Sequence, residues 1–208
     1  MQILIIGAGG QGQVVADIIL FAKEAGQDID IVGYLDDNSS SWDKEYLGFK
    51  VLGPIERWQD FKHDKVIIGI GDNRLRSELY LELKSDGAIF AKVCHPKAVI
   101  GHDVNISEGS CISAHVIIAA GTIVGCNSII HGNTVIGHHN MIGDHVHIAP
   151  GVNTTGHVEI GKGAMVGINA SIMPGRKVGE WATVGSATLV HKDVSPGTTV
   201  IGVPGRLL

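Results

Sequence analysis

The chain has 208 residues, which is enough for one large domain or two small ones. A formal net charge of -5 gives no support for nucleic-acid binding, and no apolar run approaches the ~18 residues that a membrane span requires. Cys94, Cys111 and Cys126 are an odd, scattered set without a CxxC spacing. They predict reduced thiols in a cytoplasmic protein, and the lack of a long apolar run predicts no membrane insertion.

Residues 1–94 alternate short apolar runs with amphipathic segments, which is typical of an α/β unit with a parallel sheet. The expected strands are Gln2–Ile6, Ile31–Leu35, Val51–Leu52, Lys65–Ile70 and Ile89–Val93. The expected helices run from about Gln13 to Ala25 and from about Arg74 to Lys84. The unit has about half the length of a full Rossmann domain, so we expect it to hold one nucleotide.

A glycine-rich loop joins the first expected strand to the first expected helix. Gly7, Gly9 and Gly12 match G-x-G-x-x-G, and Asp36 and Asp37 follow the second strand. Bare backbone at a helix N-terminus attracts phosphate, and a carboxylate accepts hydrogen bonds from hydroxyl or ring N–H groups. The loop therefore predicts a nucleotide site. The alternative is a tight turn that only packs the helix on the sheet.

Residues 95–208 form the second predicted domain, because His95-Pro96 favours an extended boundary. β-Branched residues recur there at every sixth position, with no insertion over about ninety residues. They are Ile100, Ile106, Ile112, Ile118, Val124, Ile130, Ile136, Ile142, Ile148, Thr154, Ile160, Val166, Ile172, Val178, Val184 and Val190. This period fits neither a helix nor an alternating strand and indicates a parallel β-helix rather than a β-sandwich. Glycine follows many of these residues, which predicts corners with positive φ there.

The stretches GAGGQGQVV, YLDD, IGIGDN and HPKAVI, followed by the six-residue repeats, resemble one branch of the hexapeptide acyltransferases. That branch comprises the nucleotide-diphospho-4-amino-sugar N-acetyltransferases and the sialic acid O-acetyltransferase-like proteins. The resemblance covers essentially the whole chain. It implies a left-handed β-helix, although parallel crossovers are generally right-handed. With three repeats to a coil, sixteen repeats give about five coils.

The resemblance also implies a function. The expected enzyme is a cytoplasmic homotrimer with its active site between subunits and acetyl-CoA as co-substrate. It would acetylate the amino group of a UDP- or dTDP-linked 4-amino-4,6-dideoxy sugar, for surface glycan or glycoprotein biosynthesis, without a metal. A neutral imidazole can take the amine proton as the C–N bond forms, and no nucleophilic cysteine is needed.

The family motifs assign roles to individual residues of this sequence. The stretch VIGHHNMIGDHVHIAPG implies that His138 is the general base. The implied acetyl-CoA contacts are His147, Gly156, Ile168, Gly185 and Ser186. The implied contacts to the nucleotide-linked substrate are Gly9, Gly10, Gln11, Asp36, Asp37 and Gly71. The terminal GVPGR resembles the family's G-x-P-A-[RK], with Gly205 in the place of alanine.

Two departures from the family pattern concern the site. Gln11 stands where the family loop commonly has histidine, so this side chain can hydrogen-bond but cannot carry charge. His139 stands where the family usually has an acidic residue, which would orient the base. Asp144 or Asp103 could take that role instead.

Three other functions would account for parts of this sequence. A γ-class carbonic anhydrase uses the same β-helix, but two of its zinc ligands lie five residues apart, and no histidine pair here has that spacing. A non-enzymatic trimeric nucleotide-binding protein would need only the glycine loop. O-Acetylation of a free sugar such as sialic acid needs the same base, so the coil sequence does not separate it from N-acetylation.

Overall fold

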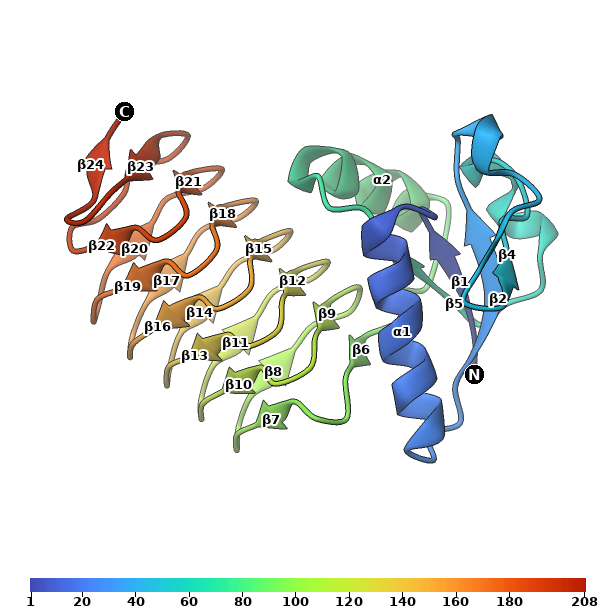
Figure 1. Ribbon diagram of the computed structural model, residues 1–208, viewed down its shortest axis with the longest axis horizontal. Coiled ribbons are helices and arrows are strands. Elements are labelled where there is room, and N and C mark those ends of the chain that lie inside the picture. Colours follow the sequence, from blue (N-terminus) through green and yellow to red (C-terminus); the bar gives the residue numbers. More distant parts are fainter. The chain divides into compact units, whose positions relative to one another are not determined.

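The computed structural model describes residues 1–208 as two compact units, Met1–Pro96 and Lys97–Leu208. The sequence placed the boundary two residues earlier. The first unit is an α/β domain with parallel strands, and the second is a left-handed parallel β-helix of about 6 turns (Figure 1). The predicted fold class is therefore confirmed, with about one turn more than the repeat count indicated.

The first unit is built on a three-stranded parallel sheet. Its strands are β1 (Gln2–Ile6), β2 (Asp30–Leu35) and β5 (Lys65–Ile68), in the order β2-β1-β5. Helix α1 (Gly10–Glu24) packs against β1 and β2, and helix α2 (Asn73–Ser85) packs against β5. The central strand is buried on both faces, which explains its unbroken apolar run.

Shorter elements complete this unit. They are the 3₁₀ turns η1 (Ser39–Ser41) and η2 (Ile55–Asp60) and the strands β3 (Glu45–Tyr46), β4 (Phe49–Lys50) and β6 (Val93–Cys94). Helix α1 begins three residues before the predicted start, because the Gln13 N–H already bonds to the Gly9 carbonyl within the glycine loop. The strand predicted at Ile89–Val93 does not form over that range: Phe90 makes an isolated bridge to Val66, and only Val93 belongs to a strand, β6.

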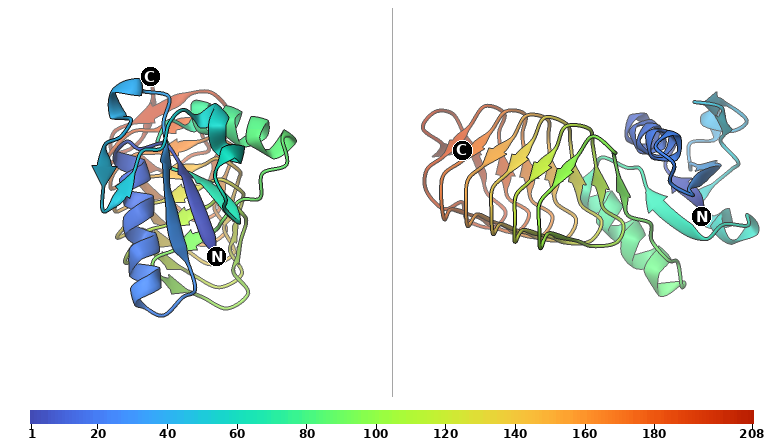
Figure 2. Two further views of the ribbon diagram at one scale, coloured as in Figure 1. Left: turned by 90° about the vertical axis from the view of Figure 1, so that its right-hand side faces the viewer. Right: turned by 90° about the horizontal axis from the view of Figure 1, so that it is seen from below.

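The β-helix has three flat faces, each built from strands of two or three residues that pair in parallel with the next coil (Figure 2). The first face consists of β7 (Val99–Ile100), β10 (Ile117–Ile118), β13 (Val135–Ile136), β16 (Asn153–Thr154), β19 (Ser171–Ile172) and β22 (Leu189–Val190). The second face consists of β8 (Asn105–Ile106), β11 (Ile123–Val124), β14 (Met141–Ile142), β17 (Glu159–Ile160) and β20 (Lys177–Val178). The third face includes β9 (Cys111–Ile112), β12 (Ile129–Ile130), β15 (His147–Ile148), β18 (Met165–Val166), β21 (Thr183–Val184) and β23 (Thr199–Ile201).

The repeated β-branched residues fill the interior of the β-helix. All of them from Ile106 to Val190 are buried, as the period predicts, and Ile100 in the first coil is 38% exposed. The glycines directly after them do not adopt positive φ, so that prediction was wrong. They are small because the next coil passes close by: a Cβ at Gly143 would lie 2.8 Å from the backbone nitrogen of Lys162.

Positive φ occurs two residues further on, within the same corners. Asparagine and histidine tolerate this conformation better than most residues, which explains their presence there. The non-glycine residues in this position are Asp103, His115, Asn127, Asn133, His139, His145, His157, Asn169, Trp181 and Ala187. Four histidines of the β-helix, His115, His139, His145 and His157, thus occupy corners for a conformational reason that is independent of chemistry.

The C-terminal segment was expected to leave the β-helix in an extended form. Instead, β23 pairs in parallel with β21, and β24 (Arg206–Leu207) folds back antiparallel to β23. The segment therefore extends the third face by one further strand and ends it with a hairpin.

Candidate functional site

One hollow of about 340 Å³ in the first unit is lined by all six residues predicted to contact the nucleotide-linked substrate. These residues are Gly9, Gly10, Gln11, Asp36, Asp37 and Gly71. They follow the carboxyl ends of β1, β2 and β5, which is where open α/β sheets bind their ligands. Ile55, Leu75 and Leu79 add an apolar wall.

The glycines of the loop serve two different purposes. A Cβ at Gly12 would lie 2.0 Å from the Gly7 carbonyl oxygen, so Gly12 allows α1 to dock closely on the sheet. Gly9 and Gly10 have no atom within 4 Å of such a Cβ. Packing explains Gly12 but not these two, which leave bare backbone open at the hollow and at the N-terminus of α1.

The polar side chains at the hollow differ in what they already bind. The Asp36 carboxylate accepts hydrogen bonds from the backbone N–H groups of Ala8 (2.8 Å) and Asn38 (2.9 Å), so it braces the glycine loop. Asp37 Oδ1 accepts from the Ile55 N–H at 2.9 Å. The Gln11 amide nitrogen is buried and has no protein partner, so it is a donor available to a ligand.

Arg76 supports the floor of the hollow and was not anticipated from the sequence. It is fully buried, and its guanidinium donates to the carbonyls of Ile70 and Gly71, both at 3.1 Å, and to Asn73 Oδ1 at 3.0 Å. It therefore holds the loop after β5. The sequence could have indicated its burial, because Arg76 lies four residues before Tyr80 and therefore on the same, buried side of α2.

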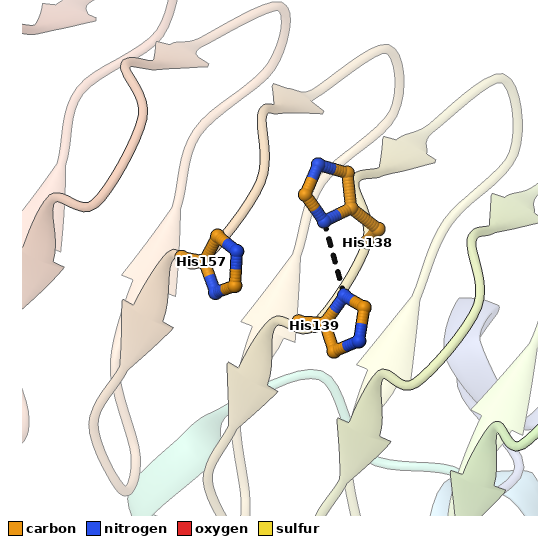
Figure 3. A group of neighbouring side chains, drawn as sticks. All are labelled: His138, His139 and His157. Atoms are coloured by element: carbon orange, nitrogen blue, oxygen red, sulfur yellow. Dashed lines mark hydrogen bonds between the residues drawn. The ribbon is translucent and has the colours of Figure 1, made fainter.

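The predicted base lies in a group of three histidines on the corner between the first and second faces (Figure 3). His138 Nδ1 and His139 Nδ1 share a hydrogen bond of 3.1 Å. His157, one coil further on, stacks against His139 with ring centroids 5.3 Å apart and lies 5.1 Å from His138. All three side chains are exposed, so a substrate can reach them.

The His138 ring lies directly over Gly156, a predicted acetyl-CoA contact. A Cβ at Gly156 would lie 2.4 Å from His138 Nε2, so only glycine leaves room for the ring in this position. The Gly156 N–H donates to no group of the protein. A free donor next to the base is the arrangement that can stabilise an oxyanion.

The other predicted acetyl-CoA contacts lie elsewhere on the β-helix. His147 belongs to the third face, where its ring packs against His131 at 4.9 Å. Ile168, Gly185 and Ser186 lie on the corner between the third and first faces, where the Ala187 N–H bonds to the Ile168 carbonyl. A single chain thus brings Gly156 to His138 but leaves the remaining contacts on another part of the surface.

The three-histidine group could also hold a metal ion, since one nitrogen from each ring lies within 4.8 Å of the others. The sequence predicts no metal. The hydrogen bond between His138 and His139 gives that pair an alternative role as a base and its orienting partner. Asp144, another candidate partner, instead accepts from the Cys126 N–H at 2.8 Å.

Neither helix of the structure is long and apolar enough to cross a membrane.

Residues 2–83 match the family model described as the PglD N-terminal domain. This match agrees with the resemblance found in the glycine loop.

Solved structures similar to this chain extend the resemblance over its full length. A variant of perosamine N-acetyltransferase from Caulobacter crescentus, in complex with CoA and GDP-perosamine, is 27% identical, with 100% of this chain and 97% of that chain covered and a TM-score of 0.92. The acetyltransferase domain of PglB from Neisseria gonorrhoeae, in complex with acetyl coenzyme A, is 26% identical, with coverage of 100% and 98% and a TM-score of 0.91. WeeI from Acinetobacter baumannii is 26% identical, with both chains covered completely and a TM-score of 0.88.

Proposed function

Because this chain is a hexapeptide-repeat acyltransferase with a PglD-type N-terminal domain, we propose that it acetylates the amino group of a nucleotide-linked sugar. Acetyl-CoA is the donor, and the product serves the assembly of surface glycans or glycoproteins. The observation that carries the proposal is the exposed His138 ring, held by His139 on one side and seated over Gly156 on the other.

The mechanism follows from the two nitrogens of His138. When His139 accepts the shared hydrogen bond, His138 carries its proton on Nδ1 and keeps a lone pair on Nε2. The substrate amine attacks the thioester carbonyl, and Nε2 takes the amine proton as the C–N bond forms. The oxyanion receives a hydrogen bond from the Gly156 N–H. Its collapse breaks the C–S bond, and the proton leaves with the thiol of CoA.

The hollow beside Gly9 and Gly10 is the proposed seat of the nucleotide. Its open backbone and the helix N-terminus suit a diphosphate, and the unpaired Gln11 amide adds a donor. The solved relative with GDP-perosamine makes GDP-linked sugars candidates besides the UDP- and dTDP-linked sugars that the family resemblance implied.

We also propose that the active enzyme is a homotrimer with its site between subunits. His138 and Ile168 lie on different corners of one chain, and a groove between two β-helices can unite them. Exposed apolar residues flank the His138 corner on both sides, which supports a contact there. They are Val99, Ile117 and Val135 on the first face and Ile123 and Met141 on the second.

The reaction is tested by following thiol release from acetyl-CoA with a panel of acceptors. The panel contains GDP-, UDP- and dTDP-linked amino sugars together with free sialic acid. We expect rapid release with one nucleotide-linked amino sugar. Release with sialic acid alone would replace the proposal by sugar O-acetylation, and no release with any acceptor would refute both.

Replacing His138 by alanine removes the proposed base. A positioned general base contributes typically ~10²–10⁴-fold, so we expect kcat to fall by about that factor while the melting temperature stays unchanged. His115→Ala is the matched control, since His115 is also an exposed corner histidine. Alanine is tolerated at this corner position, because Ala187 adopts the same positive φ at the equivalent position of a later coil. Undiminished turnover in His138→Ala would defeat the assignment.

A further inference from the structure

The column of repeated β-branched residues has one polar member, Thr154. Its side chain is only 4% exposed, and the residues one coil before and after it, Ile136 and Ile172, are fully apolar. A hydroxyl buried in such a column needs a hydrogen-bond partner, because an unpaired one is costly. Thr154 meets this need in a way that changes the β-helix locally.

The change is visible in the main-chain ladder. From residue 101 to residue 173, the N–H that follows each β-branched residue donates to the carbonyl 17 residues later, as Gly143 does to Ile160 at 2.8 Å. Gly137 is the exception: its N–H donates to the Thr154 hydroxyl at 3.0 Å instead. Accordingly, β13 and β16 pair through a single residue pair, whereas the neighbouring strands of this face pair through two.

Two further buried side chains complete the arrangement. Asn140 donates from Nδ2 to the Thr154 hydroxyl, and its Oδ1 accepts from the Val158 N–H at 2.7 Å. The Thr122 hydroxyl donates to the Gly137 carbonyl at 2.8 Å. Threonine side chains thus hold both the N–H and the C=O of Gly137. We refer to Thr122, Asn140 and Thr154 as the Gly137 clamp.

We propose that Thr154 and Asn140 are positioning residues for His138, which directly follows Gly137. This inference rests on the proposed function of His138. The orientation of the Gly137 peptide sets the direction in which the His138 side chain leaves the corner. With valine at position 154, the Gly137 N–H would donate to the residue 154 carbonyl, as the equivalent N–H groups do in other coils. The His138 ring would then move relative to Gly156. Proteins tend to break a local rule of this kind at functional sites.

The test restores the regular repeat. Thr154→Val alone leaves the buried Asn140 amide without its hydrogen-bond acceptor. We therefore combine it with Asn140→Thr, because threonine occupies the equivalent inner positions 122 and 134. We expect the double variant to melt at or above the wild-type temperature, with KM for both substrates within about 2-fold. Its kcat should fall about 10- to 100-fold, as is typical for a small displacement of a catalytic group.

Two matched variants separate positioning from general stability. Thr154→Ser keeps the hydroxyl and should retain kcat within about 2-fold of wild type, on the same principle of geometry. Thr134→Val removes a buried hydroxyl at another corner, between Val116 and Val152 in its column, and should leave kcat unchanged. Wild-type kcat in the double variant, or an equal loss in Thr134→Val, would overturn the inference.

The position of the His138 ring can also be measured directly, without an activity assay. This measurement tests the inference independently of the proposed function. A crystal structure of the double variant should show Gly137 N–H bonded to the residue 154 carbonyl and the His138 ring displaced from Gly156. An unmoved ring would overturn the positioning role even if wild type acetylates no acceptor. Absence of thiol release in wild type with a displaced ring in the variant would refute the reaction alone.

Discussion

His138 and Gly156 belong to successive coils, and the missing side chain of one makes room for the ring of the other. The spacing is so close that any Cβ at Gly156 would overlap the imidazole. The backbone of Gly156 has no positive φ, and Ala120 occupies the equivalent corner position two coils earlier. The requirement for glycine therefore comes from His138 and not from the corner.

Gly156→Ala tests this contact. We expect a loss of kcat of about 100-fold, because the base is pushed from its place, together with a lower melting temperature. The control is the same substitution in a His138→Ala chain, where the clash is gone and the melting temperature should not change. An equal drop in both backgrounds would mean that the backbone itself, and not the ring, requires glycine.

At the scale of the element, glycines occur at the corners of the β-helix for two different reasons. The period of six predicted the buried column, because burial selects β-branched residues at every coil. It did not separate the glycine that makes room for the next coil from the glycine with positive φ, since both recur with the same period. That distinction depends on the path of the backbone, which composition does not encode.

The same limit applies to the candidate site. The glycine loop and the two aspartates were readable from the sequence, because their order along the chain places them at one edge of the sheet. His138 was identified through family resemblance, since an exposed corner histidine does not differ from His115 by pattern alone. Thr154 was visible as the one exception to the aliphatic column, but its bond to Gly137 appears only in three dimensions.

The glycine loop makes its own prediction through Gln11. Its buried amide nitrogen has no protein partner, so a bound nucleotide should supply the acceptor. Gln11→Ala removes one hydrogen bond of about 1 kcal/mol, which corresponds to a rise in KM for the nucleotide-linked sugar of roughly 5-fold. The KM for acetyl-CoA should stay constant, as should both values in the exposed control Gln27→Ala. An equal rise for both substrates would argue against a nucleotide site in this hollow.

At the scale of the whole molecule, the proposed active site needs more than one chain. The exposed apolar residues on either side of the His138 corner have no cover within the chain that carries them. Burying such rows between copies removes apolar surface from water and would place a third-face corner of one chain near the His138 corner of another. The trimer would thus complete the site and stabilise the protein together.

Disrupting this contact should separate the chains without unfolding them. We expect Ile117→Glu combined with Met141→Glu to sediment as a monomer with an unchanged circular dichroism spectrum and without acetyltransferase activity, because carboxylates resist burial. The control Ser195→Glu, in an exposed turn near the end of the β-helix, should remain trimeric and active.

A sharper measurement mixes two inactive chains, His138→Ala and Ile168→Glu, after partial unfolding and reassembly. Mixed trimers contain sites that combine an intact His138 with an intact Ile168, so activity should return. If both residues acted within one chain, the mixture would stay inactive, and the proposed shared site would be abandoned.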